Sequence, residues 1–140
     1  MELKMDIPAI ETFLATEFPQ VVGEISVQEI TDAGLTARLR VQDHHLRPGN
    51  TVSGPTMFSL ADVGIYLAVL SRIGPVALAV TTSCSMDFMR KPAANTDLMC
   101  DVTLLKIGRA LAVGDALIYS EGHPKPVARA TMTYAIPPKG

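Results

Sequence analysis

The chain has 140 residues, of which 48% are hydrophobic, and its formal net charge is −2 at pH 7. This length suits one domain with a sizeable core, so we expect a single domain over residues 1–140. The charge balance excludes the strong global basic field of many nucleic-acid-binding proteins, and we expect no nucleic-acid partner.

Targeting and redox signals are weak. The N-terminal stretch MELKMDIPAIETFL is acidic and lacks the apolar region of a signal peptide. The apolar run at 57–70 is shorter than the roughly 20 residues of a membrane span, and Asp62 interrupts it. Cys84 and Cys100 lack the spacing of a CxxC pair and are interpreted as small buried hydrophobes. We therefore expect a cytoplasmic protein with no membrane partner.

The first third of the chain predicts a helix, a hairpin and a loop. Residues 7–18 repeat apolar side chains at helical spacing, with Pro8 in the first turn. The stretches GEISVQEI and LTARLRVQ alternate apolar and polar residues around the turn-like TDAG, which predicts an antiparallel hairpin with one covered face. Residues 43–53 contain Pro, Gly and Asn and are predicted to form a loop.

The rest of the chain predicts one long helix followed by four strands. Pro55 suits the start of an apolar helix that continues to Arg72, where Gly74-Pro75 ends it. The stretch PVALAVTTSCSMDFM predicts a strand, and three more are expected at 97–106, 109–120 and 126–136. The predicted fold is α+β, with an antiparallel sheet wrapped around one long central helix.

Polar side chains on this apolar helix fall on one stripe. Thr56, Ser59, Asp62 and Tyr66 follow one another at steps of three, three and four residues. Such a stripe predicts a small polar site that faces a cleft or a partner chain, with Asp62 as a candidate functional acid. Two alternatives remain. Ser59 and Asp62 also fit a capping box at a later helix start, and Asp62 could be an exposed or hydrogen-bonded acid without a catalytic role.

The start of the helix offers N–H groups that can hold an anion or a developing oxyanion. Pro55 lacks an N–H, so Gly54 and the next two residues would supply this group. Gly54 and Asp62 are eight residues apart, which is roughly 12 Å along a helix axis. Both groups would have to lie within about 3 Å of a reacting carbonyl. They must therefore come from two copies of the helix, and catalysis would require a homodimer.

The stretch SGPTMFSLAD, followed by an apolar helix, resembles the hot-dog-fold acyl-CoA thioesterases of the phenylacetate-degradation type. Their pattern is His-Gly-Gly, a short spacer and Ser-Leu-Ala-Asp. The likeness covers roughly residues 20–137 and includes MDFMRKP and KIGRALAV. It implies a hot-dog fold and dimers that pair into homotetramers. It also implies that Asp62 acts as nucleophile or general base on a thioester, opposite the N–H of Gly54 from the other subunit.

Three positions depart from the family pattern. Ser53 stands where relatives usually have His, Pro55 where they often have a second Gly, and Arg47 where they often have Asn. The hydratase members of the fold use a His beside the acid, and this chain has no His between His45 and His123. That difference favours hydrolysis over dehydration. Ser53 does not lie in a G-x-S-x-G elbow, so a serine hydrolase is not expected.

The predicted function is hydrolysis of a small, medium-chain or aromatic acyl-CoA, without a cofactor. Ser53 is a predicted substrate-binding residue, and Thr81 or Thr82 could orient a water molecule, although ordinary strand threonines are the alternative. Tyr66 could line the acyl pocket or pack in the core. A non-catalytic hot-dog protein that binds acyl groups or has a regulatory role is the alternative function.

Basic residues near a strand end are candidates for the CoA phosphates. Arg90 is the first candidate and Lys91 the second, with solvated charges at a strand end as the alternative. His44 and His45 are adjacent and expected to point apart, and no other His or Cys spacing supports them. We therefore predict no metal site.

Overall fold

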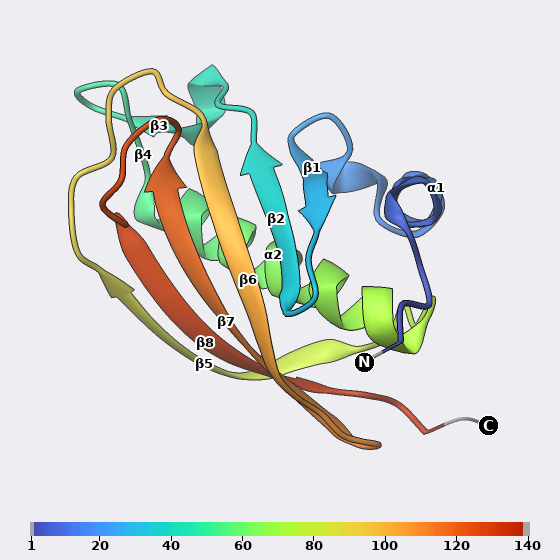
Figure 1. Ribbon diagram of the computed structural model, residues 1–140. Coiled ribbons are helices and arrows are strands. Elements are labelled where there is room, and N and C mark those ends of the chain that lie inside the picture. The colour runs from blue at the N-terminus through green and yellow to red at the C-terminus, as the bar shows by residue number, and fades with distance from the viewer. Residues whose placement is uncertain (1, 139–140) are drawn as a thin grey trace.

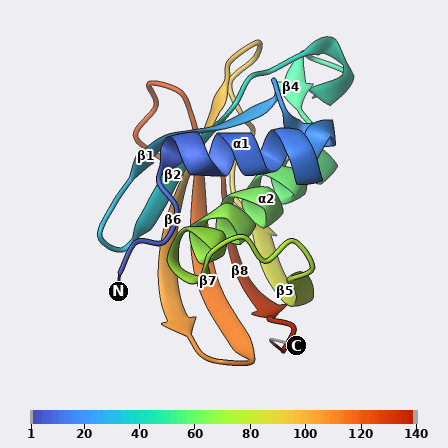
Figure 2. The ribbon, with the colours of Figure 1, turned by 90° about the vertical axis from the view of Figure 1, so that its right-hand side faces the viewer.

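The computed structural model describes residues 2–138, so residues 1, 139 and 140 of the predicted domain lie outside the described part. A six-stranded antiparallel sheet has the order β1-β2-β6-β7-β8-β5. Its strands are β1 (Ile25–Ile30), β2 (Gly34–Leu39), β5 (Val80–Phe88), β6 (Leu98–Ile107), β7 (Leu111–Ser120) and β8 (Ala128–Ala135). The sheet wraps around the long helix α2 (Gly54–Ile73) (Figure 1), and α1 (Ile7–Glu17) packs beside α2 and β1 (Figure 2). This arrangement confirms the predicted α+β hot-dog fold.

The start of α2 is fixed by its cap. Ser53 is the N-cap, and its Oγ accepts the N–H of Thr56 at 3.3 Å. Pro55 lies in the first turn, where its missing N–H costs nothing. The helix ends at Gly74, which has φ 98°. Asp62 therefore lies in the middle of the helix, and the alternative in which Ser59 caps a later start is wrong.

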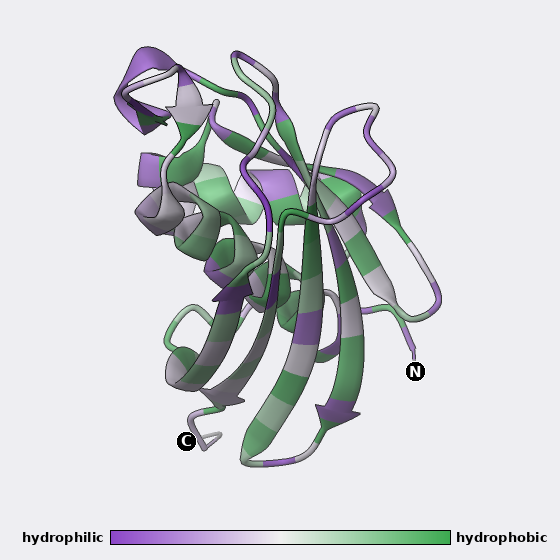
Figure 3. Cartoon of the chain, turned by 90° about the vertical axis from the view of Figure 1, so that its left-hand side faces the viewer, coloured by the Kyte–Doolittle hydropathy of each residue, from purple (hydrophilic) through white to green (hydrophobic). Residues whose placement is uncertain are grey.

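Most of α2 is core. Leu60, Ile65, Leu67 and Leu70 are fully buried. The helix is long and apolar enough to cross a membrane, but 72% of its most apolar window is buried inside the fold. Because the chain's own sheet covers it, α2 is a core helix. Seen from the side opposite to Figure 2, the strands show the expected alternation of apolar and polar residues (Figure 3).

Two predicted segments differ most from the structure. The predicted loop at 43–53 contains a 3-10 turn, η2 (Asp43–His45), and a small strand pair, β3 (Leu46–Arg47) and β4 (Thr51–Val52). Strands of two residues are too short to show an alternating pattern. The strand predicted from residue 75 begins at Val80, because the preceding residues form a turn in which the N–H of Ala79 donates to the carbonyl of Val76.

The edge strand β5 is exposed along most of its length. One edge pairs with β8, and no other strand of residues 2–138 pairs with the opposite edge. Large exposed apolar side chains on β5 and next to it are Leu78, Val80, Phe88 and Met89. A long, unpaired strand edge is a template for pairing with another chain. Cys84 lies on this strand and is exposed, so the prediction that it is buried was wrong, whereas Cys100 is buried as predicted.

Cys100 makes the stability of the fold sensitive to alkaline pH. Burial raises the pKa of the Cys100 thiol from 9.0 to about 12. The unfolded chain therefore loses this proton at a lower pH than the folded chain does. The contribution of the protonated Cys100 thiol to the free energy of unfolding is fully present below pH 9 and is lost as the pH rises toward 12.

We expect the free energy of unfolding to fall from pH 9 upward, with Cys100 contributing up to about 1.4 kcal/mol per pH unit. Tyr134 acts in the same direction, because burial and the charge of Asp62 raise its pKa. In Cys100→Ala the decline should be shallower. Urea unfolding of both proteins between pH 8 and 11 measures this difference, and identical slopes would contradict it.

Candidate active site

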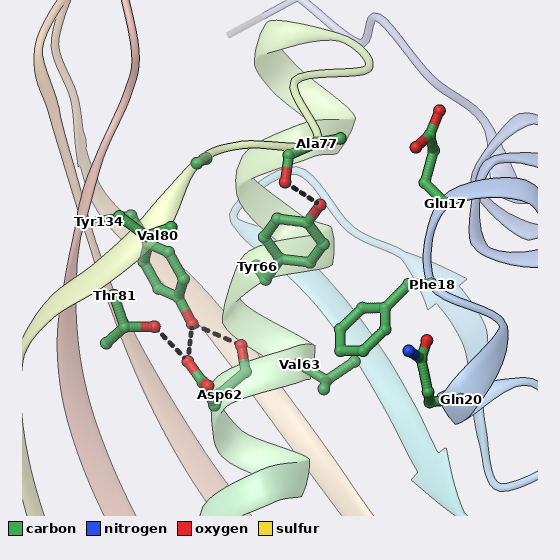
Figure 4. Close-up of a pocket in the computed structure, with 11 residues that line it drawn as sticks. Glu17, Phe18, Gln20, Asp62, Val63, Tyr66, Ala77, Val80, Thr81 and Tyr134 are labelled. Atoms are coloured by element: carbon green, nitrogen blue, oxygen red, sulfur yellow. Dashed lines mark hydrogen bonds between the residues drawn. The ribbon is translucent and has the colours of Figure 1, made fainter.

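Three elements bring polar groups together at the middle of α2. Thr81 on β5 donates its hydroxyl to Oδ1 of Asp62 at 2.5 Å. The hydroxyl of Tyr134 on β8 lies 2.5 Å from the same Oδ1 and 2.5 Å from the main-chain oxygen of Asp62 (Figure 4). No residue within 2–138 donates a hydrogen bond to Oδ2 of Asp62. One carboxylate oxygen is thus held by two donors while the other is available.

A cavity of about 430 Å³ begins at Asp62. Its lining residues are Glu17, Phe18, Gln20, Asp62, Val63, Tyr66, Ala77, Ala79, Val80, Thr81 and Tyr134. Most of this lining is apolar, with Asp62 and Thr81 on one side and the end of α1 on the other (Figure 4). Such a cavity suits an apolar group that is attached to a reactive centre next to the carboxylate.

Tyr66 both packs in the core and lines this cavity. Its hydroxyl donates to the carbonyl of Ala77 at 3.1 Å, and its ring meets Phe18 edge to face, with 6.3 Å between ring centroids. Burial raises the pKa of Tyr66, and the charge of Glu17 adds to this. Tyr66 therefore remains a neutral donor that holds the turn before β5.

The start of α2 has one N–H that is available to a ligand. The N–H of Ser53 donates to the carbonyl of His45, and that of Met57 donates to the carbonyl of Ser53. The N–H of Thr56 donates to the side chain of Ser53, and Pro55 has none. The N–H of Gly54 alone has no acceptor among residues 2–138. Only Gly54 is left of the three donors that the sequence predicted at this end.

Gly54 lines a second cavity, of about 720 Å³. Arg47, Arg90 and Lys91 line the same cavity. Arg90 donates to the carbonyl of Pro126 at 3.0 Å. None of the three cations forms an ion pair with a described carboxylate. The second cavity thus combines one free backbone donor with three positive charges.

Asp62 and Gly54 lie toward opposite ends of β5. Asp62 bonds to Thr81 near the start of the strand. A side chain at position 54 would begin 3.6 Å from the ring of Phe88, at the end of the strand. The two groups also line different cavities. Within one chain they do not share a site.

The other predicted site residues have local partners. Ser53 caps α2, and its hydroxyl lies 2.9 Å from that of Thr56. Thr82 is exposed and its hydroxyl lies 3.4 Å from the carbonyl of Thr133, so it does not reach Asp62. Tyr134 was not predicted at the site. One feature of the sequence could have indicated it: in ARATMTYA, Tyr134 carries a hydroxyl at one of the alternate positions that face the core.

His44 and His45 do not point apart, contrary to the prediction. The 3-10 turn η2 brings their ring centroids to 4.1 Å, and Nε2 of each ring lies within 3.3 Å of Oε1 of Glu24. Nδ1 of His45 accepts the N–H of Gln42 at 3.0 Å. The proton of a neutral His45 ring must then be on Nε2, the atom that faces Glu24. This pattern is a hydrogen-bonded cluster, because a metal would need that nitrogen without its proton.

Comparisons with known proteins relate this chain to one protein family. The thioesterase superfamily model matches residues 49–127. A candidate thioesterase from Silicibacter sp. TM1040 is 55% identical, with a TM-score of 0.92, and the match covers 99% of this chain and 96% of that one. A mutant of the phenylacetic acid degradation protein PaaI from Thermus thermophilus is 28% identical, with a TM-score of 0.72, covering 85% and 99% of the two chains.

A hypothetical thioesterase from Streptococcus pneumoniae TIGR4, described with coenzyme A, has a TM-score of 0.73 and covers 96% of this chain and 98% of its own. At 18% identity this likeness shows the fold alone. No curated protein sequence matches the chain. The family match spans more than half of the chain, including α2 and β5 to β7. The chain therefore belongs to the thioesterase superfamily.

Proposed function

We propose that this protein hydrolyses an acyl-CoA thioester, with Asp62 as its catalytic carboxylate. The observation that carries this proposal is the arrangement of Asp62 at the cavity. Oδ1 is held by Thr81 and Tyr134, and Oδ2 is available beside an apolar space of about 430 Å³. Oδ2 would attack the acyl carbon or remove a proton from water. A thiolate leaves readily, so no strong acid is needed.

The oxyanion would be stabilised by the N–H of Gly54 from the partner subunit. This donor has no acceptor within residues 2–138 and sits at the positive end of the helix dipole. The Asp62 and Gly54 of one chain lie in separate cavities. A complete site therefore needs two subunits, as the helix geometry also requires.

The edge strand β5 offers a direct way to form this dimer. When two β5 strands pair antiparallel about a two-fold axis at the middle of the strand, Thr81 near the start of one strand lies close to Phe88 of the partner subunit, at the end of its strand. Asp62 is bonded to Thr81, and Gly54 is next to Phe88. The pairing would thus bring Asp62 toward Gly54 of the partner subunit twice per dimer. It would also cover the exposed Val80 and Phe88.

The CoA moiety would lie near Gly54, where Arg47, Arg90 and Lys91 have no carboxylate partners within residues 2–138. Arginine and lysine are common phosphate ligands. The acyl group would enter the cavity at Asp62, whose size and apolar lining suit a small, medium-chain or aromatic group. The likeness to PaaI is consistent with the phenylacetate-degradation type. A cytoplasmic homotetramer, formed from two such dimers, remains our expectation.

A panel assay tests this function. Thiol release is measured with short, medium, long and aromatic acyl-CoAs, and light scattering during gel filtration gives the mass of the assembly. We expect hydrolysis of at least one small, medium-chain or aromatic substrate by a dimer or tetramer. Binding of acyl-CoA without thiol release would favour the non-catalytic alternative. A monomer with full activity would contradict the shared site.

A further inference from the structure

Tyr134 lies against Asp62 although it is far away in the sequence. It is on β8, is 1% exposed, and is the cross-strand partner of Thr81 in the register of β5 and β8. Both side chains of this pair therefore reach the same carboxylate. A slip of one residue in the register would turn one of the two side chains to the other face of the sheet.

The hydroxyl of Tyr134 makes two contacts with Asp62. It lies 2.5 Å from the main-chain oxygen and 2.5 Å from Oδ1. Burial, followed by the charge of Asp62 and the hydrogen bond to it, raises the pKa of Tyr134. The phenol is therefore neutral at physiological pH, and its hydroxyl can donate to either the main-chain oxygen or Oδ1 of Asp62. This bridge ties the orientation of the side chain to the backbone of α2.

A carboxylate without such a tie can turn about its last side-chain bond, because this torsion is soft. The hydroxyls of Thr81 and Tyr134 both hold Oδ1, which leaves Oδ2 without a donor from these residues, next to the cavity that Asp62 lines. Alignment of the reacting atom is a large part of the rate that a catalytic group provides. Loss of one of the two donors should therefore reduce the rate more than it reduces binding.

We propose that Tyr134 is a positioning residue that clamps Oδ1 of Asp62 and so presents Oδ2 to the thioester or to the attacking water. This inference rests on the proposed hydrolysis. Tyr134 does not contact the acyl carbon and keeps its proton throughout the reaction.

The variant Tyr134→Phe tests this role. We expect kcat to fall by about 10- to 100-fold with little change in KM, as for a lost hydrogen bond to a charged group. Tyr119→Phe, on the same sheet and outside the site, is the matched control and should leave kcat and KM unchanged.

A second variant keeps the test decisive if Tyr134→Phe folds poorly. Incorporation of 3-fluorotyrosine at position 134 keeps both the shape and the hydroxyl donor, so this protein should keep a kcat close to that of the wild type. If Tyr134→Phe keeps the wild-type kcat, or if the 3-fluorotyrosine protein loses as much kcat as Tyr134→Phe does, while Asp62→Asn is inactive, Tyr134 has only a structural role and the inference is wrong. If the wild-type protein hydrolyses no acyl-CoA, the proposed function itself fails.

Discussion

Replacement of Asp62 by Asn is expected to lower the rate of acyl-CoA hydrolysis by about 1000-fold or more. The amide has nearly the same shape, and its oxygen can still accept from Thr81 and Tyr134. It cannot act as a nucleophile or as a base. The loss should therefore appear in kcat, with an unchanged melting temperature. Steady-state thiol release by the purified variant measures it.

A matched control separates this effect from a general change of charge. Asp101 is exposed on β6, accepts a hydrogen bond from Thr36 at 3.2 Å, and lies outside both cavities next to α2. Asp101→Asn should hydrolyse acyl-CoA at the wild-type rate. If Asp62→Asn retained more than a tenth of the wild-type kcat, the assignment of Asp62 as the catalytic carboxylate would be wrong.

The second large effect is expected at Gly54. Gly54→Pro removes the one free N–H at the start of α2 and should reduce kcat by about 100- to 1000-fold, as for an oxyanion donor. Proline is well tolerated in the first turn of a helix, and no hydrogen bond between described residues is lost. A thermal melt should therefore resemble that of the wild type. Thiol release at saturating acyl-CoA gives the change in kcat.

Gly54→Ala provides the comparison for this variant. Alanine keeps the N–H, and its Cβ would lie 3.6 Å from the ring of Phe88, an ordinary contact. Its activity should exceed that of Gly54→Pro by at least about tenfold. Equal activity of the two variants would mean that the side chain, rather than the N–H, matters at this position.

The central helix and most strands could be predicted because their patterns are long and local. Gly54 and Pro55 mark the start of α2 and Gly74 marks its end, and the apolar run between them is too long for a buried strand. The stretch 109–120 lies between the turns around Gly108 and Gly122, which is enough to predict β7. The exposure of Cys84 could not be predicted, because it depends on β5 being the edge of the sheet, which is a property of the strand order.

The candidate site was predictable only where its residues share one element. Asp62 and Gly54 stand on one helix, so the distance between them follows from the helical rise per residue alone. Tyr134 approaches Asp62 through the register of β5 and β8, and no local pattern encodes that register. Likewise, Phe18 has the spacing of a core residue in the predicted first helix, and only the packing of α1 against α2 places it at the cavity.

The donor set at the helix start was also only partly predictable. The residue types indicated three N–H groups, at Gly54, Thr56 and Met57. The structure shows that Ser53 accepts the last two, once with its side chain and once with its carbonyl. A cap of this kind depends on the side-chain geometry of Ser53. The remaining single donor makes the proposed oxyanion site simpler than the sequence indicated.

Mixing two inactive variants tests the shared site most directly. Asp62→Asn retains Gly54, and Gly54→Pro retains Asp62, so a dimer with one subunit of each type has one intact site. Coexpression in equal amounts should restore about a quarter of the wild-type activity, because half of the dimers are mixed and each has one of two sites. Activity that stays at the level of the separate variants would contradict a site built from Asp62 of one subunit and Gly54 of the other.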